Sequence, residues 1–320
     1  MESIHHIRTR LASVKNIGTI TKAMEVVSAT KMRRAQGLAL SSRAYAFAAL
    51  RALADLLARV PSSHLEHHPF VAGIEGAPPT TLVVMIASDR GLAGAFNGSV
   101  ARATEAFLTR DRAKPRAITP TYRLVVVGKK LATYAQKTGL PVERMFTDYG
   151  DYATPDEVSP LVSLILAGYN EKRWNRVVVV STHFKTTLSQ VTVMRRILPM
   201  KLEWVQETAQ ELVPEHGKFA ELRAAFLGAA PEEKLTEYIF EPSPEAVLSA
   251  LLPHLLTMQV FDLVLEANAS EHSARMVAMK NASTNSKELG ESLNLEYNNA
   301  RQALITKEMI EISSAQVAAN

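Results

Sequence analysis

The sequence predicts an α/β protein, in which two long terminal helices form an antiparallel coiled coil beside a central domain with a parallel-stranded sheet. The positions of the prolines are the first evidence. All 15 fall between Pro61 and Pro253 in a chain of 320 residues, and proline interrupts the hydrogen bonds of a helix. Long helices are therefore possible at the two ends. The second evidence is three short β-branched runs in the middle, separated by stretches of helical character.

Residues 1–60 are predicted to form the N-terminal helix of the coiled coil. Their apolar residues recur three and four positions apart, the spacing of one helix face. This stripe is too narrow to fill a globular core, so a single partner helix is its simplest packing. It consists of Ile4, Ile7, Leu11, Val14, Met24, Val27, Leu38, Tyr45, Ala49, Leu53, Leu56 and Val60.

Residues 243–320 are predicted to form the C-terminal helix of the pair. Ser243 supplies a capping hydroxyl and Pro244 suits the first helical position, whereas Pro253 should kink the helix or mark its true beginning. A narrow apolar stripe follows at Leu289, Leu293, Tyr297, Ala300 and Leu304. The alternative is that both ends are ordinary helices that fold back over the central domain.

Residues 75–240 are predicted to form the central α/β domain. TLVVMIA (81–87), YRLVVVG (122–128) and RVVVVST (176–182) are nearly continuous apolar runs that alternate with helical stretches. This pattern is typical of parallel strands buried on both faces of a sheet.

The loop ASDRGLAGAFNG follows the first of these strands and opens a helix, where α/β proteins often bind phosphate. Gly91, Gly94 and Gly98 lack the spacing of a dinucleotide-binding motif, and the chain contains no G-x-x-x-x-G-K-[ST] motif. We therefore expect a tight strand-to-helix turn here. With no cysteine and no histidine or aspartate pattern of metal ligands, we expect no catalytic, cofactor or metal site.

Composition indicates a globular, soluble protein. Hydrophobic residues make up 47% of the chain, yet no apolar run approaches the roughly 20 residues of a transmembrane helix. The start, MESIHHIRTR, lacks the apolar core of a signal peptide. We therefore expect a chain that faces the cytosol and does not insert into a membrane.

Charge differs between the two predicted helices. Residues 1–50 hold eight basic and two acidic residues, whereas residues 262–311 hold five basic and eight acidic residues. Opposite charges favour pairing of the helices, and the N-terminal helix keeps a surplus of positive charge. That surplus is either a solvated face or a contact surface for an acidic protein or a nucleic acid.

Three separated segments resemble the gamma subunit of F-type ATP synthases. IRTRLASVKNIGTITKAMEVVSATKMRRAQ resembles that family's first helix, and SDRGLAGAFN is similar to the family's SDRGLCGGLN. ASEHSARMVAMKNASTNSKELGESLNLEYNNARQALITKEMIEI is similar to the family's last helix. The resemblance implies a Rossmann-like central domain and a non-catalytic central rotor shaft, which couples ion-driven rotation of the membrane c-ring to the catalytic beta subunits.

The resemblance also implies partners and a location. One copy would lie within a hexamer of alpha and beta subunits and would contact the epsilon subunit and the c-ring. The complex would place it peripherally on the cytoplasmic face of a bacterial inner membrane. Nucleic acid is not an expected partner.

Residue roles come from the same resemblance. Met24 and Arg275 would lie near the lever loops of the beta subunits, with the basic face of Lys31, Arg33 and Arg34 turned toward these loops. Gln302 and Thr306, in ARQALIT, match the positions where the shaft touches a loop of a catalytic subunit. YIFEPSP resembles the family's YLYEPDP, so Tyr238 and Glu241 would face the c-ring.

Two departures and two rival functions remain. Segment 201–236 is longer than in the shortest family members, and the tail SSAQVAAN differs from the family's usual glycine- and alanine-rich end. One rival is a basic coiled coil that binds nucleic acid through Lys31, Arg33 and Arg34. The other is an α/β enzyme that holds phosphate in the loop Asp89–Gly94.

Overall fold

A computed structural model describes residues 3–59, 68–115, 118–200 and 241–318. The chain divides into two compact units. One unit combines Met1–Ala29 with Arg275–Asn320, and the other comprises Thr30–Ala274. Helix α1 (Ile4–Arg59) and helix α9 (Pro244–Ala318) each contribute to both units.

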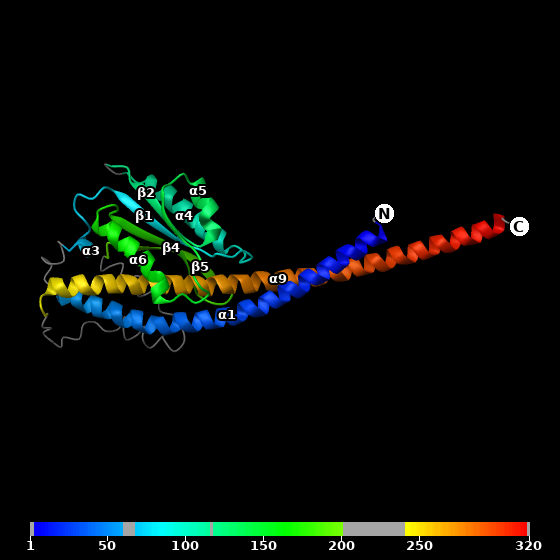
Figure 1. The fold of residues 1–320 in the computed structure, drawn as a ribbon, viewed down its shortest axis with the longest axis horizontal. Helices are drawn as coiled ribbons and strands as arrows, with labels where there is room; N and C mark the ends of the chain where they lie inside the picture. Colours follow the sequence, from blue (N-terminus) through cyan, green and yellow to red (C-terminus); the bar gives the residue numbers. More distant parts are fainter. Residues whose placement is uncertain (1–2, 60–67, 116–117, 201–240, 319–320) are drawn as a thin grey trace. The chain divides into compact units, whose positions relative to one another are not determined.

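The unit Thr30–Ala274 contains a five-stranded sheet with the order β3-β2-β1-β4-β5 (Figure 1). Strand β1 pairs in parallel with β2 and β4, β2 pairs in parallel with β3, and β5 alone is antiparallel. The strands are β1 (Thr80–Ile86), β2 (Thr121–Val127), β3 (Val142–Phe146), β4 (Arg176–Phe184) and β5 (Gln190–Leu198). The three predicted strands are the three central ones.

Helices cover both faces of this sheet (Figure 1). On one face, α4 (Phe96–Arg112), the single turn Lys129–Leu131 and α5 (Ala132–Lys137) pack on the strands. On the other face, α6 (Pro155–Asn170) packs together with part of α9. A short helix, α3 (Pro69–Ala72), precedes β1 and adds Phe70 to the second layer.

The first part of α9 belongs to the core of this domain. Leu248, Leu252, Leu256 and Leu263 are at most 1% exposed and lie in the same cluster as β1, β4 and α6. The sequence analysis assigned this part of α9 to the coiled coil alone. For this part, the alternative in which a terminal helix packs on the central domain describes the structure better. One stretch of α9 is also long and apolar enough to cross a membrane, a test that a buried core helix passes as well.

The predicted start of the C-terminal helix is confirmed. Helix α9 begins at Pro244, and the Ser243 hydroxyl accepts a hydrogen bond from the amide of Ala246 at 3.2 Å. Pro253 lies inside the helix and does not mark its beginning.

In the other unit, α1 and α9 pair in antiparallel fashion. Ile7, Leu11, Val14 and Leu293 are buried, as the stripe predicted. A Cβ on Gly18 would lie 3.3 Å from the Cβ of Ser286, and one on Gly290 would lie 3.9 Å from Val14 Cγ1. Gly18 thus lies beside Ser286, and Val14, four residues earlier in α1, lies beside Gly290, four residues later in α9. This is the pattern of an antiparallel pair.

Small residues displace the predicted stripe in two places. Val27 is 54% exposed whereas Ser28 is 3% exposed, and Leu289 is 43% exposed whereas its neighbour Gly290 is buried. Glycine and serine allow two helix backbones to approach closely, so the contact follows these residues and leaves adjacent large apolar side chains outside. The expectations for Val27 and Leu289 were wrong, as were those for Leu38 and Leu304, which are 39% and 43% exposed.

Gly128 directly follows β2, and it tolerates no side chain. Its φ is +99°, and a Cβ there would lie 2.5 Å from the carbonyl oxygen of Ala87. We predict that Gly128→Ala lowers the free energy of unfolding by more than about 2 kcal/mol, because backbone strain alone costs ~1–3 kcal/mol and a clash with backbone adds to it. Denaturant unfolding of the purified chain measures this.

Gly139 supplies the matched control. It also has a positive φ, +66°, but a Cβ there meets no atom within 4 Å. Gly139→Ala should cost only the strain of the left-handed conformation, about 1 kcal/mol. Equal losses for the two variants would contradict the proposed clash.

Candidate subunit-contact surfaces

The loop after β1 is held by side-chain hydrogen bonds. The Ser88 amide donates to Asn97 Oδ1 at 3.0 Å, Asn97 Nδ2 donates to Ser88 Oγ at 2.8 Å, and Ser88 Oγ donates to the carbonyl of Arg90 at 2.7 Å. These bonds connect the end of β1 to the start of α4. The expected tight turn is present.

Asp89 ties this loop to the ends of two further strands. Its carboxylate accepts hydrogen bonds from the amide of Lys129, after β2, at 2.9 Å, and from the amide of Asp148, after β3, at 2.8 Å. Ligands of open α/β sheets bind at this carboxyl edge of the strands. Here a carboxylate of the chain itself accepts hydrogen bonds from two backbone amides at that edge.

A hollow of about 250 Å³ lies beside Asp89. Four carboxylate residues line it, and Arg90 is the one basic residue among its described lining residues. Two of these carboxylates are paired with lysines, Asp148 with Lys129 and Asp151 with Lys31. The carboxylates belong to Asp89, Asp148, Asp151 and Glu271.

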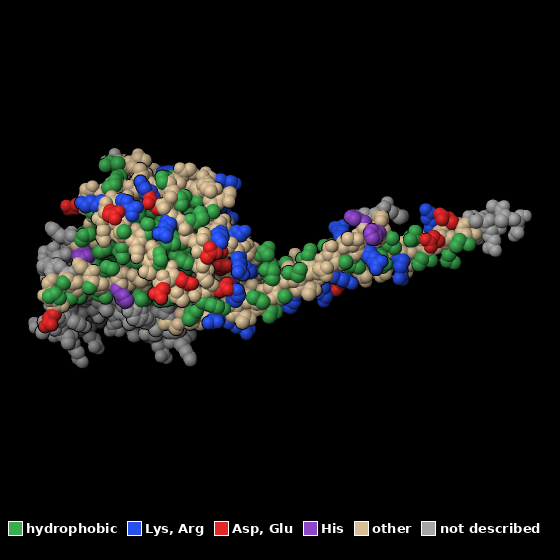
Figure 2. Space-filling view, viewed as in Figure 1, with side chains coloured by type: hydrophobic (Ala, Val, Ile, Leu, Met, Phe, Trp, Pro, Cys, Tyr) green, Lys and Arg blue, Asp and Glu red, His purple; other side chains and the backbone are tan. Residues whose placement is uncertain are grey.

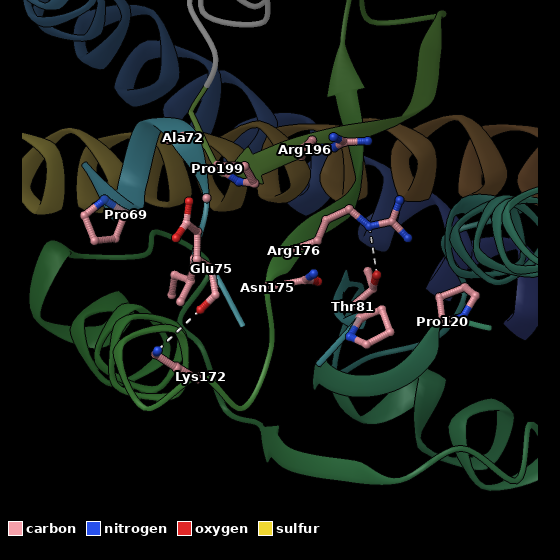
Figure 3. A pocket seen from close by; sticks show the side chains of 13 residues that line it. Pro69, Ala72, Glu75, Thr81, Pro120, Lys172, Asn175, Arg176, Arg196 and Pro199 are labelled. Carbon is pink, nitrogen blue, oxygen red and sulfur yellow. Dashed lines mark hydrogen bonds between the residues drawn. The ribbon is translucent and has the colours of Figure 1, made fainter. Parts of the chain in front are cut away.

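A larger hollow of about 860 Å³ lies at the amino ends of β1 and β4 (Figure 3). Arg176 points across it, and its Nε donates to Thr81 Oγ1 at 2.8 Å while its guanidinium pairs with Asp111. Lys172 Nζ donates to the carbonyl of Glu75 at 3.4 Å. Ligands of open α/β sheets bind at the opposite, carboxyl ends of the strands, so this hollow does not match that position.

The three basic residues predicted for one face of α1 have different surroundings. Lys31 forms a partly buried ion pair with Asp151, in the loop after β3. The Arg34 guanidinium lies 4.4 Å from the ring centroid of Tyr152 in the same loop. Arg33 is exposed. Two of the three cations thus have partners within the chain, which weakens the nucleic-acid hypothesis as well.

Met24 and Arg275 lie in the helix-pair unit. Met24 is half-buried, and Arg275 is only 7% exposed. Their predicted role beside the beta subunits stays a prediction.

Gln302 and Thr306 lie one turn apart on α9, and both are exposed. Thr306 Oγ1 donates to the carbonyl of Gln302 at 2.9 Å. Glu241 is also exposed and lies just before the start of α9. Tyr238 and the segment 201–236 lie outside the described residues.

Exposed apolar residues are the feature that the sequence did not reveal. Residues 301–312 of α9 are all exposed, and five of them are large and apolar (Figure 2). From the sequence, the helical spacing of such residues suggests that they are buried. The structure shows that they are exposed. They are Leu304, Ile305, Met309, Ile310 and Ile312, with exposures from 43% to 68%.

A family model described as ATP synthase matches residues 3–318. The match spans almost the whole chain, including both long helices and the sheet. It defines the class of protein, a subunit of an ATP synthase.

Individual relatives narrow this class. The ATP synthase gamma chain of Roseiflexus castenholzii is 36% identical over 322 residues, which cover 99% of both chains. The gamma chain of Opitutus terrae is 38% identical over 321 residues, which cover 100% of this chain and 99% of that one. The chain belongs to the ATP synthase gamma chain family.

Two solved structures share the fold of this chain, which is the predicted fold class. A chain of the Euglena gracilis mitochondrial ATP synthase OSCP/F1/c-ring assembly has a TM-score of 0.61 at 20% identity, covering 98% of this chain and 94% of that chain. A chain of the Tetrahymena thermophila mitochondrial ATP synthase central stalk and c-ring has a TM-score of 0.53 at 22% identity, covering 82% and 99%.

Asp89 should matter for stability. We predict that Asp89→Ala lowers the free energy of unfolding by about 1–3 kcal/mol, because two backbone amides lose their acceptor. Asp89→Asn keeps one acceptor oxygen and should lose less. Denaturant unfolding compares the variants, and ATP titration of the wild-type chain should show no saturable binding. A stable Asp89→Ala variant, or an ATP site that this variant abolishes, would contradict the structural role.

The ion pair of Asp151 should depend on pH. Burial raises the pKa of Asp151, but the hydrogen bond from Lys31 and the charges of Lys31, His272 and Arg90 outweigh burial and leave the pKa below its ordinary value. A lowered pKa stabilises the fold above the unfolded-state value and loses this contribution as pH falls through the folded-state value.

We therefore predict that Asp151→Asn costs about 0.5–1 kcal/mol at pH 7, as for a partly exposed ion pair. The difference from wild type should shrink as the pH falls below about 4, the ordinary pKa of an aspartate. Unfolding curves at both pH values measure it. A difference that grows toward low pH would have the wrong sign for this mechanism.

Proposed function

We propose that this chain is the rotor shaft of an ATP synthase, which couples ion-driven rotation of the membrane c-ring to conformational cycling of the catalytic beta subunits. The observation that carries the proposal is the exposed apolar end of α9, residues 301–312. No described residue covers these large apolar side chains. Contiguous exposed apolar surface marks interaction sites, so we expect another subunit to bury it. A surrounding hexamer of alpha and beta subunits supplies that covering.

The remaining partners follow from family membership. The epsilon subunit and the c-ring contact the chain, and Glu241 with Tyr238 faces the polar loops of the ring. The complex holds the chain peripherally on the cytoplasmic face of a bacterial inner membrane, without insertion of its own helices. The burial of Leu248 and Leu263 of α9 against the sheet supports this, since these residues are used within the chain.

The shaft acts on the beta subunits as a ligand with unequal contacts. Each beta subunit meets a different face of the helix pair, and a contact that is stronger in one conformation biases that conformation. Met24, Arg275 and Arg33 contact the lever loops. Of these, Arg33 is the exposed charge, and an exposed ion pair contributes below ~1 kcal/mol, so this contact can be exchanged as the shaft turns.

The chain has no active site of its own, and ATP chemistry belongs to the alpha and beta subunits. Two features support this. Asp89 accepts hydrogen bonds from the amides of Lys129 and Asp148 at this edge of the sheet, and four residues that line the hollow beside it carry carboxylates.

Reconstitution with the cognate alpha and beta subunits tests the proposal. One copy of this chain per hexamer, with steady ATP hydrolysis above that of the hexamer alone, is the expected result. The absence of a stable complex with folded partners would overturn it.

Gln302 and Thr306 test the contact at the upper part of the shaft. We predict that Gln302→Leu or Thr306→Val leaves assembly intact and lowers turnover about two- to tenfold, the effect of losing one hydrogen bond worth ~0.5–1.5 kcal/mol in a rate-determining state. Thr284→Val is the matched control, since Thr284 is also exposed on α9 but has no assigned contact. Wild-type turnover in assembled Gln302→Leu and Thr306→Val complexes would refute these roles.

A further inference from the structure

The loop after β3 contacts both long helices within the unit Thr30–Ala274. Asp151 pairs with Lys31 of α1, and its Oδ1 lies 3.5 Å from Nε2 of His272 on α9. Asn268 of α9 donates a hydrogen bond to the carbonyl of Gly150 at 3.3 Å. One short loop thus connects the edge of the sheet to α1 and to α9.

Tyr152 adds a fourth contact. Its ring lies under the Arg34 guanidinium of α1, 4.4 Å from centroid to Cζ. Arg34 is one helical turn after Lys31, so both cations of α1 project toward the same loop. Cation–π contacts and ion pairs are directional, and they resist rotation of a helix about its own axis.

We propose that Gly150, Asp151 and Tyr152 form a clasp that fixes the rotational position of α1 and α9 on the α/β domain, so that torque passes between the domain and the helix pair. The inference rests on the proposed rotor function. It assigns a positioning role to Asp151 and Tyr152, and it reassigns Lys31 and Arg34 from contact with beta subunits to contact within the chain.

Apolar packing already holds α9, because its buried side chains interdigitate with those of the sheet and α6. In α1, Met32 and Ala35 are the buried apolar residues among the described side chains of this unit. Among the residues whose side chains are described, α1 contributes none to the two apolar clusters that cover the sheet. The clasp is therefore a described polar connection between α1 and the sheet layer.

Both helices are uninterrupted beyond their clasp residues. Helix α1 extends from Arg34 back to Ile4, and α9 extends from His272 to Ala318. A twist applied at the clasp is transmitted along a continuous helix, since each turn is held by backbone hydrogen bonds. The clasp also acts on both helices at once, which prevents them from rolling independently.

The test uses the assembled ATP synthase in liposomes, with ATP hydrolysis and ion pumping measured on the same sample. In the double variant Asp151→Asn/Tyr152→Leu, the first change removes the charge at constant size and the second replaces the ring with a smaller apolar side chain. We expect assembly and hydrolysis to persist, and ions pumped per ATP to fall about two- to fivefold, the factor that about 0.5–1 kcal/mol corresponds to.

Asp148→Asn is the matched control. Asp148 lies in the same loop but pairs with Lys129 instead of a long helix, and asparagine tolerates its φ of 64°. The control should pump like wild type. An unchanged pumping ratio in the double variant would overturn the clasp, whereas a wild-type complex that neither assembles nor pumps would overturn the rotor function itself.

A second variant tests the clasp if the double variant fails to assemble. The chain contains no cysteine, so Lys31→Cys/Asp151→Cys introduces a single reactive pair, used with partner subunits that lack accessible thiols. Without a cross-linker this variant should pump poorly, and a short bifunctional thiol reagent should restore the ratio. Equal pumping before and after cross-linking would contradict the proposal.

Discussion

The burial of one apolar segment of α9 against the sheet is the contact on which the rest of the structure depends. Leu248, Leu252, Leu256 and Leu263 are at most 1% exposed, and each fully buried leucine contributes about 1.5–3 kcal/mol relative to an exposed one. This packing anchors the helix in the α/β domain. Because α9 continues unbroken to Ala318, the same helix that completes the domain core also provides one half of the helix pair.

The contacts of the helix pair are of a different kind. Small residues such as Gly18, Ser28 and Gly290 lie at the contact, and large apolar residues beside them stay outside. Close backbone approach gives a narrow seam with little buried apolar area, so the seam itself is modest in energy. The end of α9 beyond this seam exposes still more apolar surface. Strong packing thus lies within the domain, and the exposed surface lies where subunits of the complex are proposed to bind.

Part of this fold could be predicted from local signals. The proline distribution predicted both long helices, the three apolar runs predicted the central strands, and the capping residue Ser243 predicted the start of α9. The edge strands β3 and β5 were not predicted, because VERMF and QVTVMRRIL are partly polar and partly exposed. A half-exposed edge strand lacks a continuous apolar run. The role of Asp89 depends on three strand ends that meet only in the folded sheet. The contact residues rested on resemblance, and pairing of Lys31 with Asp151, 120 positions apart, had no local signal.

Rotation of single complexes would show whether this chain turns with ATP hydrolysis. The alpha and beta subunits would be fixed to a surface, and a bead would be attached to the α/β domain of this chain at an exposed position such as Arg110 on α4. With ATP supplied, we expect rotation in one direction, with three pauses in each turn, one for each beta subunit. Steady ATP hydrolysis beneath a stationary bead would show that the chain does not turn with catalysis, and would contradict the rotor function.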